Sequence, residues 1–280
     1  MLLIIPLVVL LGIALGVARS RARLRTHDTF TLASAHRHLA ELPVLAPIAI
    51  AATLALILLL RSPRFAWYLP PELDLWSGII LWLLSGGVFA YLAGIGVHVA
   101  FVRRDPERGK LVFACVVILG ALGFLQVRGE WPVAGHLGHQ QTPEGYVLQT
   151  SAYSCCAASL ANVARHWGVP ATEPQMARLA GTTCAGTSVG QAMHALQQIG
   201  LRGRKRTATI EELRRIQNPC ILLVEYPGHG PDSHAVALLP STNSTFRIID
   251  PLAGPESWSA DHLRRVWRGH AIECRRDGRD

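Results

Sequence analysis

The sequence predicts two regions of different fold class: a four-helix transmembrane N-terminal region, and after it an α+β domain with an antiparallel sheet. Of the 280 residues, 50% are hydrophobic and only 16% are charged, whereas soluble domains usually carry about 25% charged residues. The long apolar runs are confined to residues 1–128. Residues 129–280 show helical patterns first and strand patterns later, which is typical of α+β domains.

Four apolar runs are predicted to be membrane-spanning helices, because a spanning helix needs about 20 apolar residues, with a range of about 17 to 25. No charged residue precedes the first run and arginines follow it, so we interpret it as a retained anchor and not as a signal peptide. None of the runs contains Asp, Glu, Lys or Arg, which favours an anchor over an ion pathway. The four predicted spans are residues 2–18, 42–60, 77–101 and 111–127.

The basic residues of the loops predict an orientation. Loop 19–41 holds five arginines and loop 103–110 holds four basic residues, and such loops stay in the cytoplasm. Four spans then put both chain ends outside. We therefore expect an integral protein of a bacterial-type inner or plasma membrane, with the lipid bilayer as a partner and the domain at 146–280 on the extracytoplasmic side.

The distribution of charge argues against nucleic-acid binding. Residues 1–128 carry twelve basic and six acidic side chains, whereas residues 129–280 carry fifteen and thirteen. A nucleic-acid-binding protein needs a basic patch on a folded domain, and here the excess lies beside the apolar runs. The run "RGRK" at 202–205 is interpreted as a solvated surface segment.

The second half begins with a linker at 129–145, which is rich in Gly, Pro and Gln. Capping boxes, "TEPQ" at 172–175 and "TIEE" at 209–212, each predict the start of a helix. Apolar runs bounded by Gly, Pro, Asn and Ser predict strands. The expected helices are 154–166, one from 173, 189–199, one from 210 and 259–267, and the expected strands are 220–226, 234–240 and 245–250.

The stretch "QTSAYSCCAA" at 149–158 places two cysteines where a helix is predicted to begin. A helix N-terminus and a nearby imidazole both favour the reactive thiolate. His234 begins a predicted strand after "GHGPDS", and Asp250 ends the next strand, so paired strands would bring this histidine and its orienting carboxylate together. Gln149 stands where an amide can stabilise an oxyanion. The alternative is that both cysteines are small buried residues.

The order Gln149, Cys155, His234, Asp250 resembles the bacteriocin-processing cysteine peptidases, a papain-like family that cleaves after double-glycine leaders. The resemblance covers about residues 146–270 and is carried by "QTSAYSCCAASL", "DSHAVALL" and "IIDPLAG". It implies Cys155 as the nucleophile, His234 as the base, Asp250 as the orienting group and Gln149 as the oxyanion donor. Cys156 stands where the family usually has glycine.

Many members of that family are joined to an export transporter with an ATPase. No Walker sequence, Gly-x-x-x-x-Gly-Lys-Ser/Thr, occurs in this chain. The chain therefore resembles the peptidase part without the transporter and ATPase parts, and a separate export system is a candidate partner.

These observations predict a membrane-anchored cysteine peptidase that cleaves a peptide bond in a secreted or membrane-associated polypeptide. Two alternatives remain open: a catalytically inactive, peptide-binding membrane module, and an acyl-transferring, transamidase-like enzyme with the same triad. No cofactor is expected, and the lone His-x-x-His of His136 and His139 does not make a zinc site. Among three possible disulfide pairings in an oxidising setting we favour Cys156 with Cys184.

Overall fold

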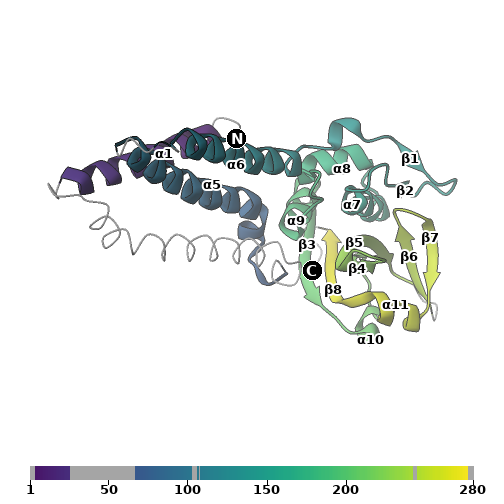
Figure 1. The fold of residues 1–280 in the computed structure, drawn as a ribbon. Coiled ribbons are helices and arrows are strands. Elements are labelled where there is room, and N and C mark those ends of the chain that lie inside the picture. The colour runs from purple at the N-terminus through teal and green to yellow at the C-terminus, as the bar shows by residue number, and fades with distance from the viewer. Residues whose placement is uncertain (1–3, 26–66, 103–105, 107, 242–244, 277–280) are drawn as a thin grey trace. The chain divides into compact units, whose positions relative to one another are not determined.

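The structure, a computed structural model, describes residues 4–25, 67–102, 106, 108–241 and 245–276. The chain divides into two compact units (Figure 1). Unit 1 consists of Met1–Arg61 and Ser77–Arg128, and unit 2 consists of Ser62–Trp76 and Gly129–Asp280. Unit 2 therefore contains a short N-terminal segment besides the C-terminal half of the chain.

The described part of unit 1 is helical, and glycines allow two of its helices to pack closely. A Cβ atom at Gly16 would lie 2.3 Å from the carbonyl oxygen of Tyr91, and one at Gly94 would lie 2.5 Å from that of Ile13. Such distances leave no room for any side chain, so α1 and α5 approach each other backbone to backbone. The helices are α1 (Ile4–Arg25), α5 (Pro71–Val102) and α6 (Arg108–Gly129).

The structure contradicts the predicted four-helix transmembrane region. Within the described ranges no helix is both long enough and apolar enough to cross a membrane. The prediction counted uninterrupted apolar residues, but α1 and α6 extend into the charged residues beside those runs: α1 includes four arginines, and α6 includes Arg108, Lys110 and Arg128. The run at 42–60 lies outside the described residues. The predicted integral-membrane localisation with an extracytoplasmic domain depended on the four spans, so it is wrong as well.

The sheet of unit 2 has six strands in the order β3-β8-β4-β5-β6-β7 within the described residues, and every pair of neighbours is antiparallel. Hairpins connect β4 to β5, β5 to β6 and β6 to β7, whereas β8 returns to lie between β3 and β4. The strands are β3 (Leu201–Thr207), β4 (Cys220–Tyr226), β5 (Gly230–Leu239), β6 (Phe246–Asp250), β7 (Gly254–Trp258) and β8 (Trp267–Arg276). A separate pair consists of β1 (Gln140–Gln141) and β2 (Val147–Leu148).

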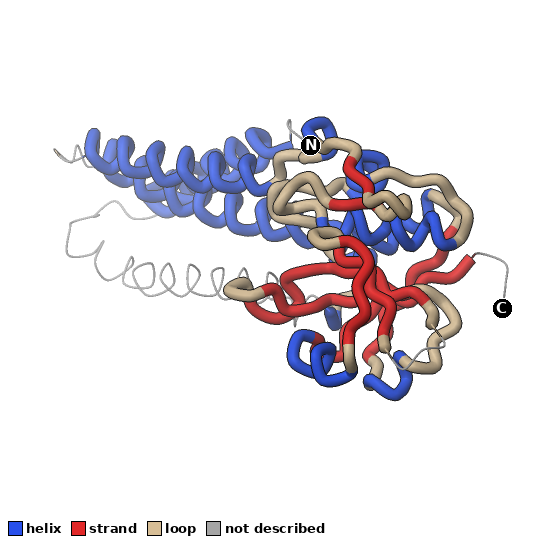
Figure 2. Tube along the Cα trace, turned by 90° about the vertical axis from the view of Figure 1, so that its right-hand side faces the viewer, coloured by secondary structure: helices blue, strands red, loops and turns tan. Residues whose placement is uncertain are grey.

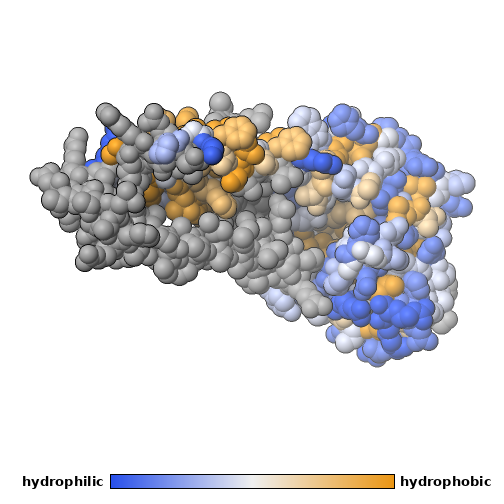
Figure 3. All heavy atoms as spheres, viewed as in Figure 1, coloured by the Kyte–Doolittle hydropathy of each residue, from blue (hydrophilic) through white to orange (hydrophobic). Residues whose placement is uncertain are grey.

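Helices cover both faces of this sheet, since alternate side chains of a strand point to opposite faces. One core packs α7 (Cys155–His166), α8 (Glu173–Ala180) and α9 (Val189–Gln198) against alternate residues such as Ile221, Ala237 and Ile272. The other packs α10 (Ile210–Leu213) and α11 (Ala260–Val266) against residues such as Leu222 and Leu238. Figure 2 shows helices above and below the strands, and Figure 3 shows a mostly hydrophilic surface at the end of unit 2 that holds α10 and α11.

The predicted elements of the α+β domain form with small shifts of their ends, and β4 has the predicted bounds. The N-caps act as expected: Thr172 accepts from the amide of Gln175, and Thr209 and Glu212 form a full capping box. The run at 202–205, interpreted as a solvated surface segment, lies in strand β3. Five of the seven residues of β3 carry long polar or hydroxyl side chains, so the sequence shows no strand period there.

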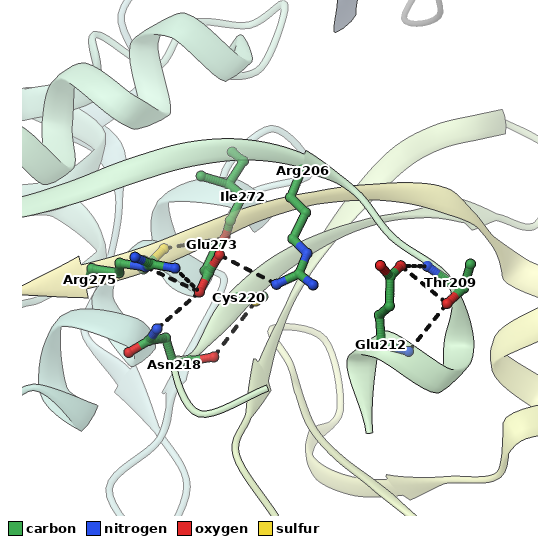
Figure 4. A network of polar contacts seen from close by, with 9 residues as sticks. Arg206, Thr209, Glu212, Asn218, Cys220, Ile272, Glu273 and Arg275 are labelled. Carbon is green, nitrogen blue, oxygen red and sulfur yellow. Dashed lines mark hydrogen bonds and ion pairs between the residues drawn. The ribbon is translucent and has the colours of Figure 1, made fainter. Parts of the chain in front are cut away.

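A network of charged groups joins one edge of the sheet to the turn before β4 (Figure 4). The carboxylate of Glu273 on β8 is buried, accepts hydrogen bonds from Asn218 at 2.9 Å and Arg275 at 3.1 Å, and lies 3.5 Å from Arg206 on β3. Burial raises the pKa of Glu273, but these hydrogen bonds and positive charges outweigh burial and lower it. The carboxylate therefore stays ionised and stabilises this edge.

Candidate active site

The site begins at the N-terminus of α7, where a tight turn ends and Cys155 becomes the first helical residue. The hydroxyl of Ser154 accepts from the amide of Ser151 and donates to its carbonyl oxygen, at 3.2 and 2.9 Å. This side chain therefore stabilises the turn and does not cap the helix. The first amides of a helix have no partner within the helix, so they face the space in front of Cys155.

His234 and Asp250 meet at the same end of neighbouring strands. Nε2 of His234, on β5, lies 2.9 Å from Oδ1 of Asp250, the last residue of β6. The same carboxylate oxygen accepts from the amide of Leu252, 2.9 Å away, within the turn that follows β6. The carboxylate is thereby fixed on two sides, and the imidazole is 7% exposed.

The third member, Cys155, lies close enough to His234 to raise the pKa of the imidazole. Because Nε2 faces the carboxylate of Asp250, Nδ1 is the ring nitrogen left for the thiol. A buried hydrogen bond joins the two elements: the hydroxyl of Ser159, one turn into α7, donates to the carbonyl oxygen of Ala235 on β5 at 2.9 Å. The structure thus brings three of the four predicted residues together, with His234 between Asp250 and Cys155.

The partners of the imidazole determine its charge. Burial lowers the pKa of His234, but the hydrogen bonds and charges of Asp250 and Cys155 outweigh burial and raise the pKa to about 9. Burial raises the pKa of Asp250, yet the hydrogen bonds from His234 and from the amide of Leu252 lower it below the usual range. At neutral pH the ring is therefore cationic beside an anionic carboxylate.

The fourth residue, Gln149, is held by two hydrogen bonds to backbone carbonyl oxygens. Its side-chain amide donates to the carbonyl oxygen of Ser151 at 2.8 Å, and its backbone amide donates to that of Pro251 at 2.9 Å. The backbone contact links Gln149 to the turn directly after Asp250. A primary amide carries two N–H groups, so one of them is free of the contact with Ser151.

The C-terminal half of the chain matches a known protein family. The model of the peptidase C39 family matches residues 144–278. An uncharacterised protein of Methanothermobacter thermautotrophicus is 30% identical over 133 residues, which is 48% of this chain and 89% of that protein. The chain belongs to the peptidase C39 family.

Other relatives are more distant. The colicin V secretion/processing ATP-binding protein CvaB of Escherichia coli is 26% identical over 45% of this chain and 17% of its own length. Among solved structures, the peptidase domain of Streptococcus ComA, a bi-functional ABC transporter, is 24% identical, with a TM-score of 0.43 over 47% of this chain and 97% of that one. We refer to the matched part as the C39 domain.

The two adjacent cysteines of the C39 domain have different surroundings. The thiol of Cys156 is buried in the helix–sheet core, and burial, with the neighbouring Cys155, raises its pKa far above the usual value. Cys155 is partly exposed and contacts His234. The predicted disulfide between Cys156 and Cys184 is wrong, because both are free cysteines and Cys156 points into the core.

Sequence reasoning missed two groups that hold the segment around Gln149. The side chain of Asn162 on α7 accepts from and donates to the backbone of Val147, at 2.8 and 2.9 Å. The carboxylate of Glu173 on α8, 1% exposed, accepts from both the amide and the hydroxyl of Thr150 at 2.8 Å. The sequence signal for Asn162 and Glu173 was a polar residue at a helical position that faces the core.

An aromatic ring lies beside the imidazole of His234. The ring of Tyr226, at the end of β4, lies 5.6 Å from that of His234 at a tilt of 55° and is exposed on its other side. Nothing in the sequence pattern pointed to Tyr226.

Over the described ranges no group of three or more His, Cys, Asp or Glu side chains has the arrangement of a metal site.

Proposed function

We propose that the C39 domain is a cysteine peptidase in which Cys155 is the nucleophile, His234 the general acid and base, and Asp250 the group that orients the imidazole. The observation that carries the proposal is the hydrogen bond between His234 and Asp250 beside Cys155, whose proximity raises the pKa of the imidazole. Asp250 holds the ring by Nε2, so Nδ1 faces the sulfur, and the cationic ring stabilises a thiolate beside it.

The reaction follows in two halves. The Cys155 sulfur attacks the scissile carbonyl carbon, and the oxyanion that forms is stabilised by the free N–H of Gln149 and the amides at the start of α7. The C–N bond then breaks, His234 gives its proton to the leaving amine, and a thioester remains on the sulfur. Water, deprotonated by His234, hydrolyses the thioester, and the departing thiolate and the protonated ring restore the starting ion pair.

The substrate class that we propose is a polypeptide with a double-glycine leader. Membership of the C39 family supports it, and one structural relative is described as a double glycine motif protease from an AMS/PCAT transporter in complex with the leader peptide. Two adjacent glycines expose their backbone and adopt conformations closed to other residues. Such a segment can reach a thiol that lies at the base of a turn, as Cys155 does.

The test compares a peptide cut after Gly-Gly with the same peptide carrying Ala-Ala there, using the full chain and mass spectrometry of the products. The proposal expects cleavage after Gly-Gly, none by Cys155→Ala, and much slower cleavage of Ala-Ala. An added primary amine separates the acyl-transfer alternative, because a transferase would form an amide with it. Absence of cleavage together with an unreactive Cys155 would favour the inactive peptide-binding alternative.

A further inference from the structure

A second buried histidine–aspartate pair lies in unit 2, close to His234 in the chain. Nδ1 of His270, on β8, lies 2.8 Å from Oδ2 of Asp232, whose side chain is 3% exposed. Asp232 stands two residues before His234, at the start of β5. The proposed reaction uses neither residue of this pair.

Two features of Asp232 are unfavourable by themselves. Its φ angle is +58°, and it is the one non-glycine residue with a positive φ in the described ranges. Its second oxygen, Oδ1, is buried and has no hydrogen-bond partner among the described residues. A strained backbone and a half-satisfied buried carboxylate persist where the surrounding structure enforces them, often next to a functional site.

The pair compensates for a break in the sheet. The register of β4 against β5 shifts between Val224 and Tyr226, and that of β4 against β8 shifts between Leu222 and Val224. The backbone ladder is thus irregular at the end where β5 carries His234. The contact between Asp232 and His270 spans β4 and joins β5 directly to β8 at this end.

A short segment from far earlier in the chain covers this pair. We call residues 67–75 of unit 2, which include the start of α5, the docked segment. The ring of Trp67 stacks on that of His270, with centroids 4.4 Å apart and planes 19° apart. On β3, Thr207 accepts from Nε1 of Trp67 at 3.3 Å, and Lys205 donates to the carbonyl oxygens of Trp67 and Leu69 at 3.2 and 2.8 Å.

The other end of the docked segment is held by α9. Oδ2 of Asp74 accepts from the amide of Gly190 at 2.6 Å. A Cβ atom at Gly190 would lie 2.4 Å from the carbonyl oxygen of Pro71, so only glycine permits this approach. The segment is therefore fixed at both ends on the C39 domain, and Trp67 is its contact with the histidine–aspartate pair.

We propose that Asp232 and His270 are positioning residues for His234, and that the stacking of Trp67 makes this positioning depend on the docked segment. The proposal rests on the proposed function, because it concerns the regulation of the same site. With Trp67 in place, His270 is fixed, Asp232 keeps its strained conformation, and the start of β5 holds His234 toward Cys155 and Asp250. Without Trp67, His270 is no longer fixed, and the irregular end of the sheet loses the contact between Asp232 and His270 that joins β5 to β8.

The test uses the full chain and five variants, with kcat, KM and melting temperature measured for each. Asp232→Gly removes the carboxylate but suits a positive φ, so the fold is retained. Trp67→Ala removes the stack. Its matched control, Tyr68→Ala, changes the adjacent aromatic residue, which is 79% exposed. His270→Asn keeps an N–H donor near the position of Nδ1 and should recover part of what His270→Ala loses.

We expect Asp232→Gly and Trp67→Ala to lower kcat by about tenfold or more with KM changed less than about twofold, since small displacements of a reacting group cost about this much. A kcat within about twofold of the wild type in both variants would overturn the proposal. The proposal would also be overturned if kcat fell only in proportion to the fraction of protein that had unfolded.

A second readout does not need peptidase activity. In protein labelled with ¹⁵N-histidine, the ring N–H signal of His234, assigned with His234→Ala, reports its contact with Asp250. It should shift or broaden in Asp232→Gly and Trp67→Ala but not in Tyr68→Ala. If it does so in a protein that cleaves no peptide, the proposed function fails and the positioning role stands. An unchanged signal in both variants contradicts the positioning role whatever the activity.

Discussion

Nε2 of His234 lies 2.9 Å from Oδ1 of Asp250, although the two residues are 16 positions apart in the chain and lie on different strands. The backbone amide of Leu252 donates to the same oxygen. The amide of Leu252 thus fixes the carboxylate independently of the ring. Because Nε2 faces Asp250, Nδ1 is the ring nitrogen left for Cys155. The predictions below follow from this arrangement and from the groups around it.

The contact between His234 and Asp250 should make the protein less stable as pH rises toward 9. The pKa of His234 is raised from 6.5 to about 9 in the folded state, so its contribution is complete below about pH 6.5 and is lost as pH rises through about 9. Asp250→Asn should therefore lower the melting temperature most near pH 6, and the difference should shrink by pH 9.5. Asp261→Asn, at an exposed helical position, is the control. A difference between wild type and Asp250→Asn that stays constant over this range would contradict the coupling.

Gln149→Ala should lower kcat by about 100-fold or more, because loss of one oxyanion donor costs about 2.7 to 4 kcal/mol in the transition state. KM should change little, since the contact forms only as the oxyanion develops. Steady-state kinetics on a cleaved peptide measures both constants. Gln198→Ala, at the exposed end of α9, should behave as wild type, and a loss below about threefold at Gln149 would assign it another role.

Glu173→Ala should destabilise the fold and slow the reaction together. The buried carboxylate holds both the amide and the hydroxyl of Thr150, the residue after Gln149. Hydrogen bonds to charged groups contribute about 1.5 to 3 kcal/mol to stability, so chemical denaturation should show a loss of that order. Thr150→Val, which removes only the hydroxyl contact, should lose less. An equal loss in the two variants would mean that the backbone contact contributes nothing.

The network around Glu273 should make the sheet edge sensitive to acid. Its pKa is lowered in the folded state, so its stabilisation is present above its usual value near 4.5 and is lost as pH falls through the folded value. At pH 7, Glu273→Ala should cost about 1 to 3 kcal/mol, because it leaves Asn218 and two arginines without their partner. The wild-type and variant stabilities should converge as pH falls through the lowered pKa of Glu273. Glu211→Ala, in an exposed ion pair of 3.8 Å, should cost under about 0.5 kcal/mol.

Local sequence signals predicted much of the candidate site. A cysteine at a helix start, a histidine after a turn and an aspartate before proline each carry a short-range pattern, and two of them lie on neighbouring strands. The pair of Asp232 and His270 carries none, because its contact spans β4 and depends on breaks in the sheet register. Trp67 lies 203 positions before His270 in the printed sequence, so no local pattern connects them.

The errors in the predicted fold have similar causes. Strand β3 was missed because only one of its seven residues is buried, so it lacks the alternation that marks a half-buried strand. Strand β7 consists of Gly254–Trp258, in which Gly, Pro and Glu obscure the period. The transmembrane prediction rested on apolar runs without charged residues, whereas helices α1 and α6 extend beyond those runs into arginines and a lysine.

The central claim, that Cys155 is the activated nucleophile, is tested most directly by labelling the full chain with a thiol-directed activity probe. Two variants are compared: Cys155→Ala, which removes the thiol that contacts His234, and Cys156→Ala, which removes the buried neighbour. The account predicts that labelling disappears in Cys155→Ala and persists at least in part in Cys156→Ala. Labelling that survives in Cys155→Ala at the wild-type level, or that disappears only in Cys156→Ala in a folded protein, would contradict it.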